Sequence, residues 1–208
     1  MDAVVMCGGR GTRLATATEK PLVAVGDRPM VDRVVEALVA AAGVDRVVAA
    51  VSPHTPATRA HLREREAAST VVETAGEGYV ADLDDALAAV SRPALTVAAD
   101  LPLLDGEAVE TVVTAYERVA SEADGTAPSL SVCVPADRVR ALGATLDTTF
   151  APDGRSLAPT GVNVVGEPDG SDRRLVRADD RLAVNVNRSR DRRVAARLLA
   201  ERQRGAET

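Results

Sequence analysis

Residues 1–14 read Met-Asp-Ala-Val-Val-Met-Cys-Gly-Gly-Arg-Gly-Thr-Arg-Leu, an apolar segment that runs into a glycine-rich loop. Residues 3–6 are continuously apolar, which favours a short buried strand. The loop continues to residue 20, and a connection of that length usually carries function. Glycines with bare backbone N–H groups, flanked by arginine and lysine, predict a polyphosphate-binding loop at the end of the first strand.

A single lysine follows this loop. The chain has 25 basic residues, and all of them except Lys20 are arginine. The two cations are not interchangeable, since arginine is a planar fork whereas lysine is a compact ammonium on a flexible stem. Because Lys20 lies in Glu19-Lys20-Pro21, beside the glycine-rich loop, we expect it to contact phosphate and not to be an ordinary surface charge.

Length and composition predict one compact domain over residues 1–208, with a frayed tail from about residue 201. Aromatic residues make up only 1% of the chain, so the core must consist of Val, Ala and Leu. Such a chain has no aromatic surface on which single-stranded nucleic acid could stack. The net charge of −6 also lacks the basic footprint of a duplex-binding protein, so we expect no nucleic-acid partner.

No targeting or membrane segment is expected. The first residues are acidic and too briefly apolar for a signal peptide, and no apolar stretch has the length of a membrane span. Cys7 and Cys133 make neither a disulfide framework nor a metal site, and both lie in apolar, strand-like segments. We therefore expect buried cysteines and a cytoplasmic location. We expect His54 and His61 to be solvated; the alternative for His54, which follows Ser52 and Pro53, is a place in the nucleotide pocket.

Strand-like apolar runs alternate with helical patterns along the chain. The expected strands cover residues 3–6, 47–51, 70–73, 93–99, 129–134, 161–165 and 182–186. The expected helices cover residues 30–39, 56–67, 79–90, 107–119 and 188–203. This alternation predicts an α/β fold with a mostly parallel sheet and helices on both faces. Ligands of such sheets bind beyond the carboxyl ends of the strands, which makes Ser52, Gly76, Gly78 and Asp100 candidate site residues beside the first loop.

The first loop and the lysine segment together resemble the signature of nucleotidyltransferases. The loop contributes Gly-Gly-x-Gly-Thr-Arg-Leu at residues 8–14, and Glu-Lys-Pro-Leu-Val follows at residues 19–23. A dinucleotide fingerprint fits poorly because Leu14 replaces its third glycine, and the Gly-Lys-Ser/Thr of a Walker loop is absent. The resemblance implies a single Rossmann-like nucleotidyltransferase domain. Such enzymes join a nucleoside monophosphate to a phosphate acceptor and expel pyrophosphate.

The residue types in this signature suit a triphosphate. Glycines let backbone N–H groups approach phosphate oxygens, and arginines offer bidentate contacts, although ordinary surface charge is the alternative for Arg10 and Arg13. Lys20 would stabilise the charge that develops on the α-phosphate and the leaving group. We expect Lys20, Arg13 and Asp100 to be catalytic. The expected nucleotide-binding residues of the loop are Gly8, Gly9, Arg10, Gly11, Thr12, Arg13 and Lys20.

Asp100 follows the apolar run 93–99 at the expected ligand edge. A carboxylate there suits Mg²⁺, which prefers oxygen ligands; a turn or helix cap is the alternative. In the fold of the resembled family this aspartate works with a polar residue near the C-terminus. Asn187 matches that element, with Asn185 as a second choice and helix capping as its alternative role. We therefore expect Asp100 and Asn187 to hold Mg²⁺.

Five segments are similar to the archaeal adenosylcobinamide-phosphate guanylyltransferases of cobalamin assembly. They are residues 1–4, 52–56, 74–83, 159–165 and 185–187. The resemblance implies GTP as donor, a corrinoid phosphate as acceptor, and nucleotide contacts from Gly8, Gly161 and Asn187. A phosphate monoester is largely ionised at neutral pH and needs no general base, in agreement with the lack of an obvious base–nucleophile pair.

Two alternatives stay open at this point. The same chemistry could serve another acceptor, such as molybdopterin or a sugar phosphate. A non-catalytic nucleotide-binding subunit could also share the fold. The oligomeric state is open as well, since apolar helical faces suit either a core or a homodimer.

Overall fold

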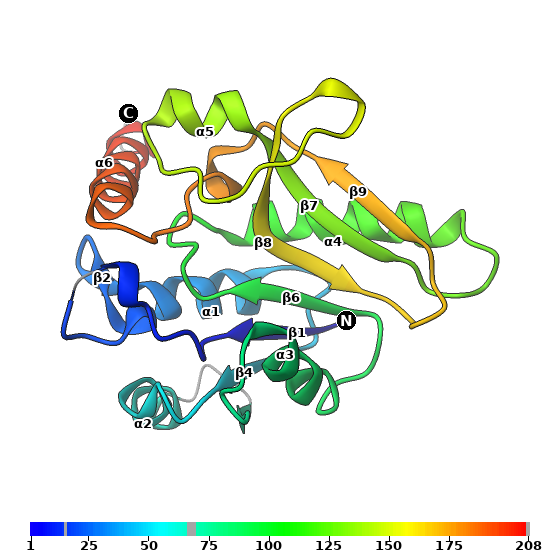
Figure 1. Cartoon of the computed structure of the whole chain (residues 1–208), viewed down its shortest axis with the longest axis horizontal. Helices are drawn as coiled ribbons and strands as arrows, with labels where there is room; N and C mark the ends of the chain where they lie inside the picture. The colour runs from blue at the N-terminus through cyan, green and yellow to red at the C-terminus, as the bar shows by residue number, and fades with distance from the viewer. Residues whose placement is uncertain (15, 66–69, 207–208) are drawn as a thin grey trace.

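In the computed structural model, which describes residues 1–14, 16–65 and 70–206, the first strand lies inside the main sheet. β1 (Asp2–Met6) pairs in parallel with β4 (Arg46–Val51) on one side and with β6 (Ala94–Ala98) on the other. Residues 3–5 are fully buried, as expected for a strand covered on both faces. The glycine-rich loop therefore leaves from the carboxyl end of an interior strand (Figure 1).

One reversed strand interrupts an otherwise parallel sheet. The seven strands have the order β5-β4-β1-β6-β8-β7-β9. β8 runs antiparallel to β6 and β7, and the other neighbouring pairs are parallel. The mostly parallel α/β sheet expected from the sequence is thus confirmed. The four remaining strands are β5 (Thr70–Glu73), β7 (Ser129–Pro135), β8 (Leu157–Val165) and β9 (Asp172–Val176).

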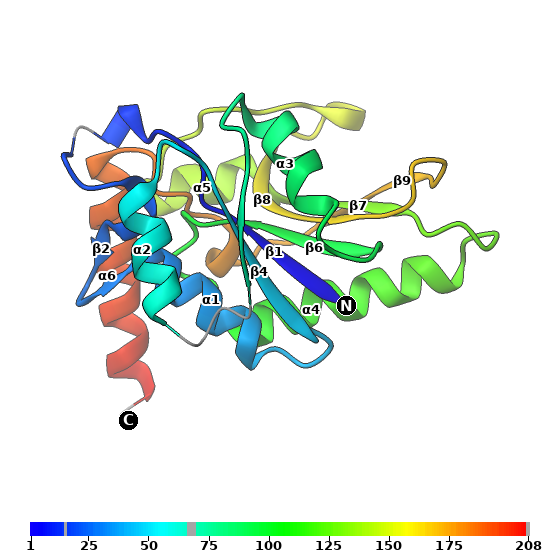
Figure 2. The same ribbon diagram turned by 90° about the horizontal axis from the view of Figure 1, so that it is seen from below.

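Helices cover both faces of this sheet. They are α1 (Met30–Ala40), α2 (Pro56–Glu64), α3 (Tyr79–Leu87), α4 (Gly106–Ser121), α5 (Ala136–Leu142) and α6 (Ser189–Ala206). Figure 2 shows α3 on one face and α1 and α4 on the other. Val5 accordingly belongs to the large core cluster with Val34 and Val112, whereas Val4 belongs to a smaller cluster with Ala86. In the described part of the chain, none of these helices combines the length and the apolar character of a membrane span.

The expected strand at residues 182–186 is wrong. Leu182 ends the short 3-10 helix η4 (Asp180–Leu182), and the following residues pair in no sheet. Val184 and Val186 are fully buried, and the Val186 amide donates a hydrogen bond to the Asp100 carbonyl at 2.9 Å. The apolar run therefore reflects burial beside Asp100 and not strand pairing.

Three small elements were not predicted. β9 has the sequence Asp-Arg-Arg-Leu-Val and lies at the edge of the sheet, so it lacks the apolar signal of a buried strand. α5 has only seven residues. The third element is the hairpin of β2 (Ala24–Val25) and β3 (Arg28–Pro29).

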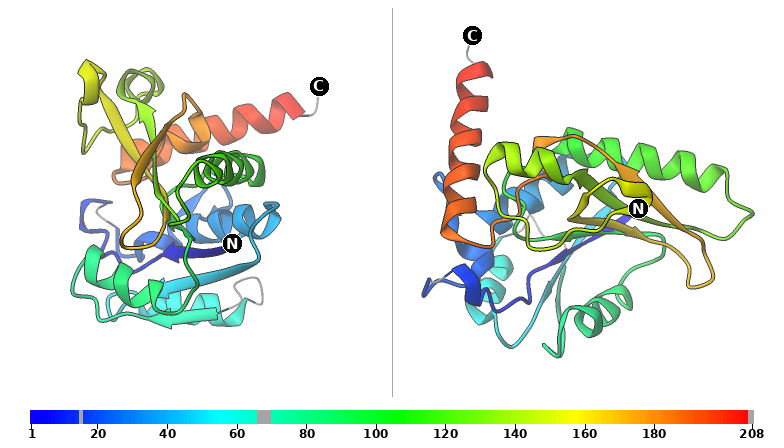
Figure 3. Two further views of the ribbon diagram at one scale, coloured as in Figure 1. Left: turned by 90° about the vertical axis from the view of Figure 1, so that its right-hand side faces the viewer. Right: turned by 45° about the horizontal axis from the view of Figure 1, so that its top comes forward.

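The ends of several helices differ from their expected positions; α3, for example, ends at Leu87 instead of residue 90. α2 ends at Glu64, and residues 66 and 67 of the expected helix lie outside the described residues. α6 continues to Ala206, so residues 201–206 of the expected tail are helical, and residues 207 and 208 are not described. Figure 3 shows the C-terminal part of α6 extending beyond the body of the molecule.

A buried carboxylate fixes the start of α6. The Asp191 side chain is fully buried, and its Oδ2 accepts hydrogen bonds from the backbone amides of Asn187 at 3.1 Å and Arg188 at 2.9 Å. Its Oδ1 accepts from the amide of Thr145 at 2.8 Å. Asp191, the third residue of α6, thereby bonds back to the two residues before the helix, as in a capping box, and joins the helix to the loop after α5.

We expect Asp191→Ala to lower the free energy of unfolding by about 3 kcal/mol, because three partly buried amides lose their acceptor. Urea denaturation followed by circular dichroism measures this change. The control is Asp169→Ala, at an exposed turn, which should stay within about 0.5 kcal/mol of the unsubstituted protein. A loss no larger than that of the control would show that Asp191 does not hold this turn.

Candidate active site

Three residues from distant parts of the chain meet at the carboxyl edge of the sheet. Lys20 begins the 3-10 helix η2 (Lys20–Leu22), Asp100 follows β6, and Asn187 precedes α6. The Lys20 Nζ donates hydrogen bonds to Asp100 Oδ2 at 2.5 Å and to Asn187 Oδ1 at 2.6 Å. The Lys20 and Asp100 side chains are only 17% and 14% exposed. The ammonium and its two oxygen partners therefore form one cluster that is largely shielded from bulk water.

A second asparagine supports this cluster. Asn185 Nδ2 donates to Asp100 Oδ1 at 3.1 Å and to the Thr160 carbonyl at 3.0 Å. Gly161 adopts φ of +80°, and a Cβ there would lie 3.0 Å from Ala98 Cβ and 3.1 Å from Asn185 Nδ2. Gly161 thus leaves the space in which Asn185 orients Asp100.

The segment before Lys20 is fixed from two sides. The Glu19 carboxylate accepts hydrogen bonds from the amides of Ala57 at 2.8 Å and Thr58 at 2.7 Å, and from the Thr58 hydroxyl at 2.6 Å. Burial raises the pKa of Glu19, but these hydrogen bonds outweigh burial and hold that pKa below its ordinary value. Gly11 has φ of +60°, and a Cβ there would lie 2.5 Å from Lys20 Cβ, so only glycine fits.

A cavity of about 350 Å³ lies against Lys20 and Asp100, a volume suited to a small-molecule ligand. Ser52 does not line this cavity. Its hydroxyl donates to the Gly8 carbonyl at 2.8 Å and so holds the glycine-rich loop from outside the cavity. The cavity therefore lies between two glycine-bearing loops, the loop after β1 and the loop that contains Gly76 and Gly78, at the carboxyl ends of the strands. The expected nucleotide-binding residues that line it, besides Lys20, are Gly8, Gly9, Arg10, Gly76 and Gly78.

Three further residues line this cavity: His54, which the sequence offered only as an alternative, and Tyr79 and Asp82, which were not expected. The expectation that His54 is solvated is wrong, because its Nε2 lies 3.1 Å from Arg10 Nη2 and 3.2 Å from the Gly76 carbonyl. Partial desolvation, together with the negative charge of Asp100, raises the pKa of Tyr79. Tyr79 carried a usable signal, since it follows Gly78 in a chain with almost no aromatic residues.

His61 also differs from its expected state. Its Nε2 lies 2.7 Å from Asp32 Oδ1, and the Asp32 side chain is buried. This pair joins α2 to α1 and does not line the cavity beside Lys20.

A second cavity, of about 470 Å³, shares Lys20, Tyr79 and Asp100 with the first. Apolar side chains from β7, α5 and β8 form part of its wall, so it can hold a group that is not purely ionic. Reacting groups in the two cavities would therefore meet at the Lys20 cluster. The expected site residues that only this second cavity contains are Arg13, Gly161 and Asn187.

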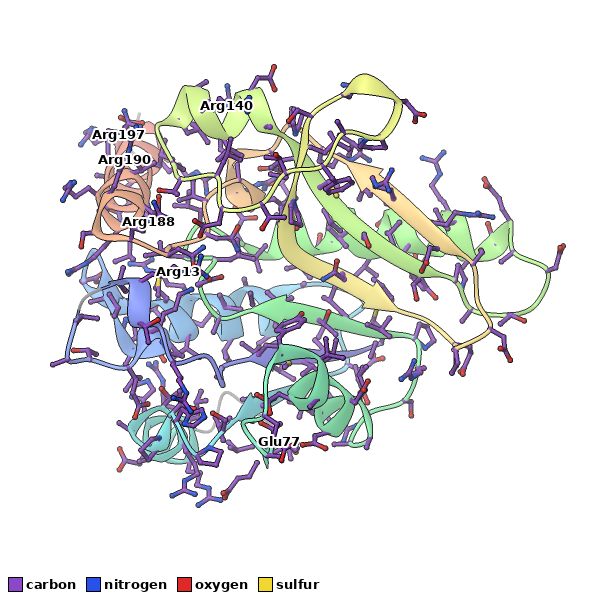
Figure 4. All side chains as sticks on the ribbon, in the orientation of Figure 1. Arg13, Glu77, Arg140, Arg188, Arg190 and Arg197 are labelled. Atoms are coloured by element: carbon purple, nitrogen blue, oxygen red, sulfur yellow. The ribbon has the colours of Figure 1, made fainter. Side chains whose placement is uncertain are left out.

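Arg13 does not point at the Lys20 cluster. Its Nη1 donates to Asp147 Oδ2 at 2.8 Å, and Arg188 Nη2 donates to Asp147 Oδ1 at 2.9 Å. Figure 4 shows Arg13 and Arg188 close to one another near the start of α6. Gly11 and Thr12 line neither cavity, and Thr12 is exposed in the 3-10 helix η1 (Thr12–Leu14).

The donor set of the cluster determines which cations it could hold. Among the described residues, no group of three or more His, Cys, Asp or Glu side chains could bind a metal ion. Asp100 and Asn187 supply a carboxylate and an amide oxygen, which are ligands for a hard cation. A Mg²⁺ ion usually takes few protein ligands and completes its shell with phosphate oxygens and water, so this small set fits it.

Comparison with known proteins places this geometry in a family. The MobA-like NTP transferase domain matches residues 3–147. The adenosylcobinamide-phosphate guanylyltransferase of Methanocaldococcus jannaschii is 29% identical over 202 residues, covering 96% of this chain and 97% of that protein. The bifunctional protein GlmU of Halalkalibacterium halodurans is 30% identical over 122 residues, covering 58% of this chain and 27% of that protein.

Solved structures share the fold at lower sequence identity. A hypothetical transferase from Thermus thermophilus superimposes with a TM-score of 0.66 at 21% identity, covering 92% of this chain and 98% of that chain. A CMP:2-keto-3-deoxy-manno-octonic acid synthetase complexed with CTP gives a TM-score of 0.66 at 13% identity, covering 97% and 98%. Because the domain match spans well over half of the sequence, and the signature loop and Lys20 lie within it, the chain belongs to the MobA-like NTP transferase family.

Proposed function

We propose that the protein transfers GMP from GTP to adenosylcobinamide phosphate, which yields adenosylcobinamide-GDP and pyrophosphate. The observation that carries this choice of substrates is the similarity to the Methanocaldococcus jannaschii guanylyltransferase, which extends over 96% of this chain and 97% of that protein. The similarity to the GlmU protein covers only 58% of this chain.

The two cavities suit a donor and an acceptor. The first cavity, with its glycine-bearing loops, would hold the nucleoside of GTP, and the signature loop would hold the phosphates. The second cavity, whose wall is partly apolar, would hold the acceptor phosphate and the adjoining part of a large organic molecule. The α-phosphate would then lie at Lys20, where an acceptor oxygen forms the new bond and pyrophosphate leaves.

The chain's own residues provide positioning and charge. The Lys20 ammonium would neutralise charge that grows on the α-phosphate and on the departing pyrophosphate. In the structure Lys20 is held between Asp100 and Asn187, so it is oriented before a substrate arrives. The acceptor phosphate is ionised at neutral pH, so no protein base has to remove a proton from it.

Asp100 and Asn187 would also hold Mg²⁺. When bound, the ion would supply additional positive charge to the phosphate oxygens. Asn185 keeps Asp100 oriented toward the site through its hydrogen bond to Oδ1. This arrangement favours a catalytic role for the protein over that of a nucleotide sensor, which would have no use for an oriented carboxylate at the α-phosphate.

The direct test is incubation with GTP and adenosylcobinamide phosphate, followed by mass analysis for the GDP-linked product. We expect this product with GTP and much less of the corresponding products with ATP or CTP. Parallel reactions with molybdopterin and with sugar 1-phosphates test other acceptors. Faster turnover of one of these, or tight GTP binding without turnover on any acceptor, would contradict the proposal.

We expect Lys20→Ala to lower kcat at least about 100-fold while the Kd for GTP changes little, because the ammonium acts mainly on charge that develops during the reaction. Steady-state kinetics and calorimetry measure the two quantities. Equal losses in kcat and kcat/KM indicate a transition-state role. Lys20→Arg serves as the matched variant and should recover little, because a planar guanidinium does not replace a compact ammonium here. A rise in KM alone would exclude this role.

We expect Asp100→Asn to shift the Mg²⁺ concentration needed for half-maximal activity upward by about tenfold or more, because the carboxylate charge is lost from the proposed ion site. A Mg²⁺ titration of initial rates measures the shift. Asp169→Asn, at an exposed turn, is the charge-matched control and should leave the titration unchanged. The same result for Asp100→Asn would remove Asp100 from the ion site.

A further inference from the structure

Asp82 is a buried acid inside the first cavity. Its side chain is only 6% exposed, although it lines the cavity with Gly8, Gly76 and Tyr79. No Arg, Lys or His among the described residues forms an ion pair with it. A carboxylate removed from water in this way is costly unless hydrogen-bond donors compensate it. Only part of that compensation comes from the protein.

One of the two carboxylate oxygens of Asp82 is engaged. Oδ1 accepts a hydrogen bond from the Gly76 amide at 2.7 Å. No donor for Oδ2 is found among the described residues, and Oδ2 lies 3.3 Å from the position that a Cβ on Gly8 would take. The absence of a side chain at Gly8 keeps this oxygen open to the cavity floor. Within the described part of the chain, Oδ2 is therefore an acceptor without a partner that borders a cavity.

The chemistry of the nucleobases decides which ligand fits. An ionised carboxylate only accepts hydrogen bonds. Guanine presents two adjacent donors, N1–H and the N2 amine, on one edge. Adenine and cytosine present a ring-nitrogen acceptor beside their amine, and uracil places a carbonyl on each side of its single N–H. Those acceptors would face the carboxylate at a cost, so a buried acid of this kind selects guanine.

We infer that Asp82 is the residue that selects guanine, by accepting hydrogen bonds from N1–H and the N2 amine of the base. This inference rests on the proposed use of GTP as the donor substrate. Oδ2 contacts the base, and Oδ1 keeps its bond to the Gly76 amide, so base recognition and the position of the loop from Gly76 to Gly78 are joined in one side chain. Base choice thus needs no residue outside the cavity.

Isothermal titration calorimetry with GTP, ITP and XTP tests the inference on the whole chain. Inosine lacks the N2 amine, and xanthine carries a carbonyl in its place. We expect the unsubstituted protein to bind GTP about tenfold more tightly than ITP, because one hydrogen bond to a charged group is lost. We expect Asp82→Asn to weaken GTP binding by about tenfold or more, and to bring the GTP-to-ITP ratio close to one.

The asparagine variant also has a gain that a damaged fold cannot produce. Its Oδ1 can still accept from the Gly76 amide, while its Nδ2 can donate to the carbonyl of xanthine. XTP should therefore bind to Asp82→Asn at least about tenfold more tightly than to the unsubstituted protein. The matched control is Asp85→Asn, because Asp85 lies on the same helix and accepts from the neighbouring Ala75 amide at 3.1 Å but does not line the cavity. The control should leave all three affinities unchanged.

Several results would overturn the inference. One is equal affinity of the unsubstituted protein for GTP and ITP. Another is a uniform loss for all three nucleotides in Asp82→Asn, which would assign a purely structural role. A third is a loss for 2′-deoxy-GTP that depends on Asp82 without any GTP-to-ITP difference, which would place the ribose at the carboxylate. The two proposals can fail separately. If GTP binds more tightly than ITP but no acceptor is converted, the proposed function fails and Asp82 keeps its role. If the enzyme is active and uses ITP as well as GTP, only the role of Asp82 fails.

Discussion

An ammonium group held between a carboxylate and an amide oxygen joins three segments that are far apart in the chain. Lys20 is 80 residues from Asp100 and 167 residues from Asn187, yet its Nζ contacts both within 2.6 Å. A charge in such a shielded position is stable only if its partners are held in place. Much of the surrounding structure serves this condition. Glu19 fixes the segment before the lysine, and Asn185 orients the carboxylate of Asp100. The buried Asp191 side chain fixes the start of α6.

The sheet explains how such distant residues can meet. β1 and β6 are parallel neighbours, so their carboxyl ends open at the same edge, and the signature loop and Asp100 emerge side by side. The reversed strand β8 lies next to β6 and brings Gly161 against Ala98. The segment that ends at Asn187 then reaches the same place, since the Val186 amide is bonded to the Asp100 carbonyl. A two-sided site follows from this topology, with one cavity on the parallel half and the other extending over the reversed strand.

The sequence predicted the parts of the site that depend on the sheet and missed those that depend on side-chain packing. The strand at residues 3–6 and the acid after the run 93–99 follow from periodicity and strand ends, and both lie where they were expected. The run at residues 182–186 has the same apolar character as a strand, but burial without pairing produces the same pattern. Asp82 lies in the family-like segment 74–83, but its own role was not predicted, because an acidic residue at one helical position is usually exposed and only the fold shows that it faces a cavity. The partner of Arg13 was equally hidden, since Asp147 lies 134 positions away.

The contrast between one lysine and many arginines has a structural basis in α6. Arginines of this helix donate to backbone carbonyls of other segments: Arg190 to Gly143 at 2.6 Å, Arg197 to Leu142 at 3.0 Å and Arg202 to Leu103 at 3.0 Å. Figure 4 shows Arg190 and Arg197 on this helix, near α5. A forked guanidinium can reach a carbonyl from an exposed helix and still direct other N–H groups to water, so arginine suits these joints. At residue 20 the requirement is different. The Lys20 Nζ lies 2.5 Å from Asp100 Oδ2 and 2.6 Å from Asn187 Oδ1, and the space between these two oxygens admits a compact cation. The chain therefore uses guanidinium groups to join its segments and places its only lysine where the two cavities meet.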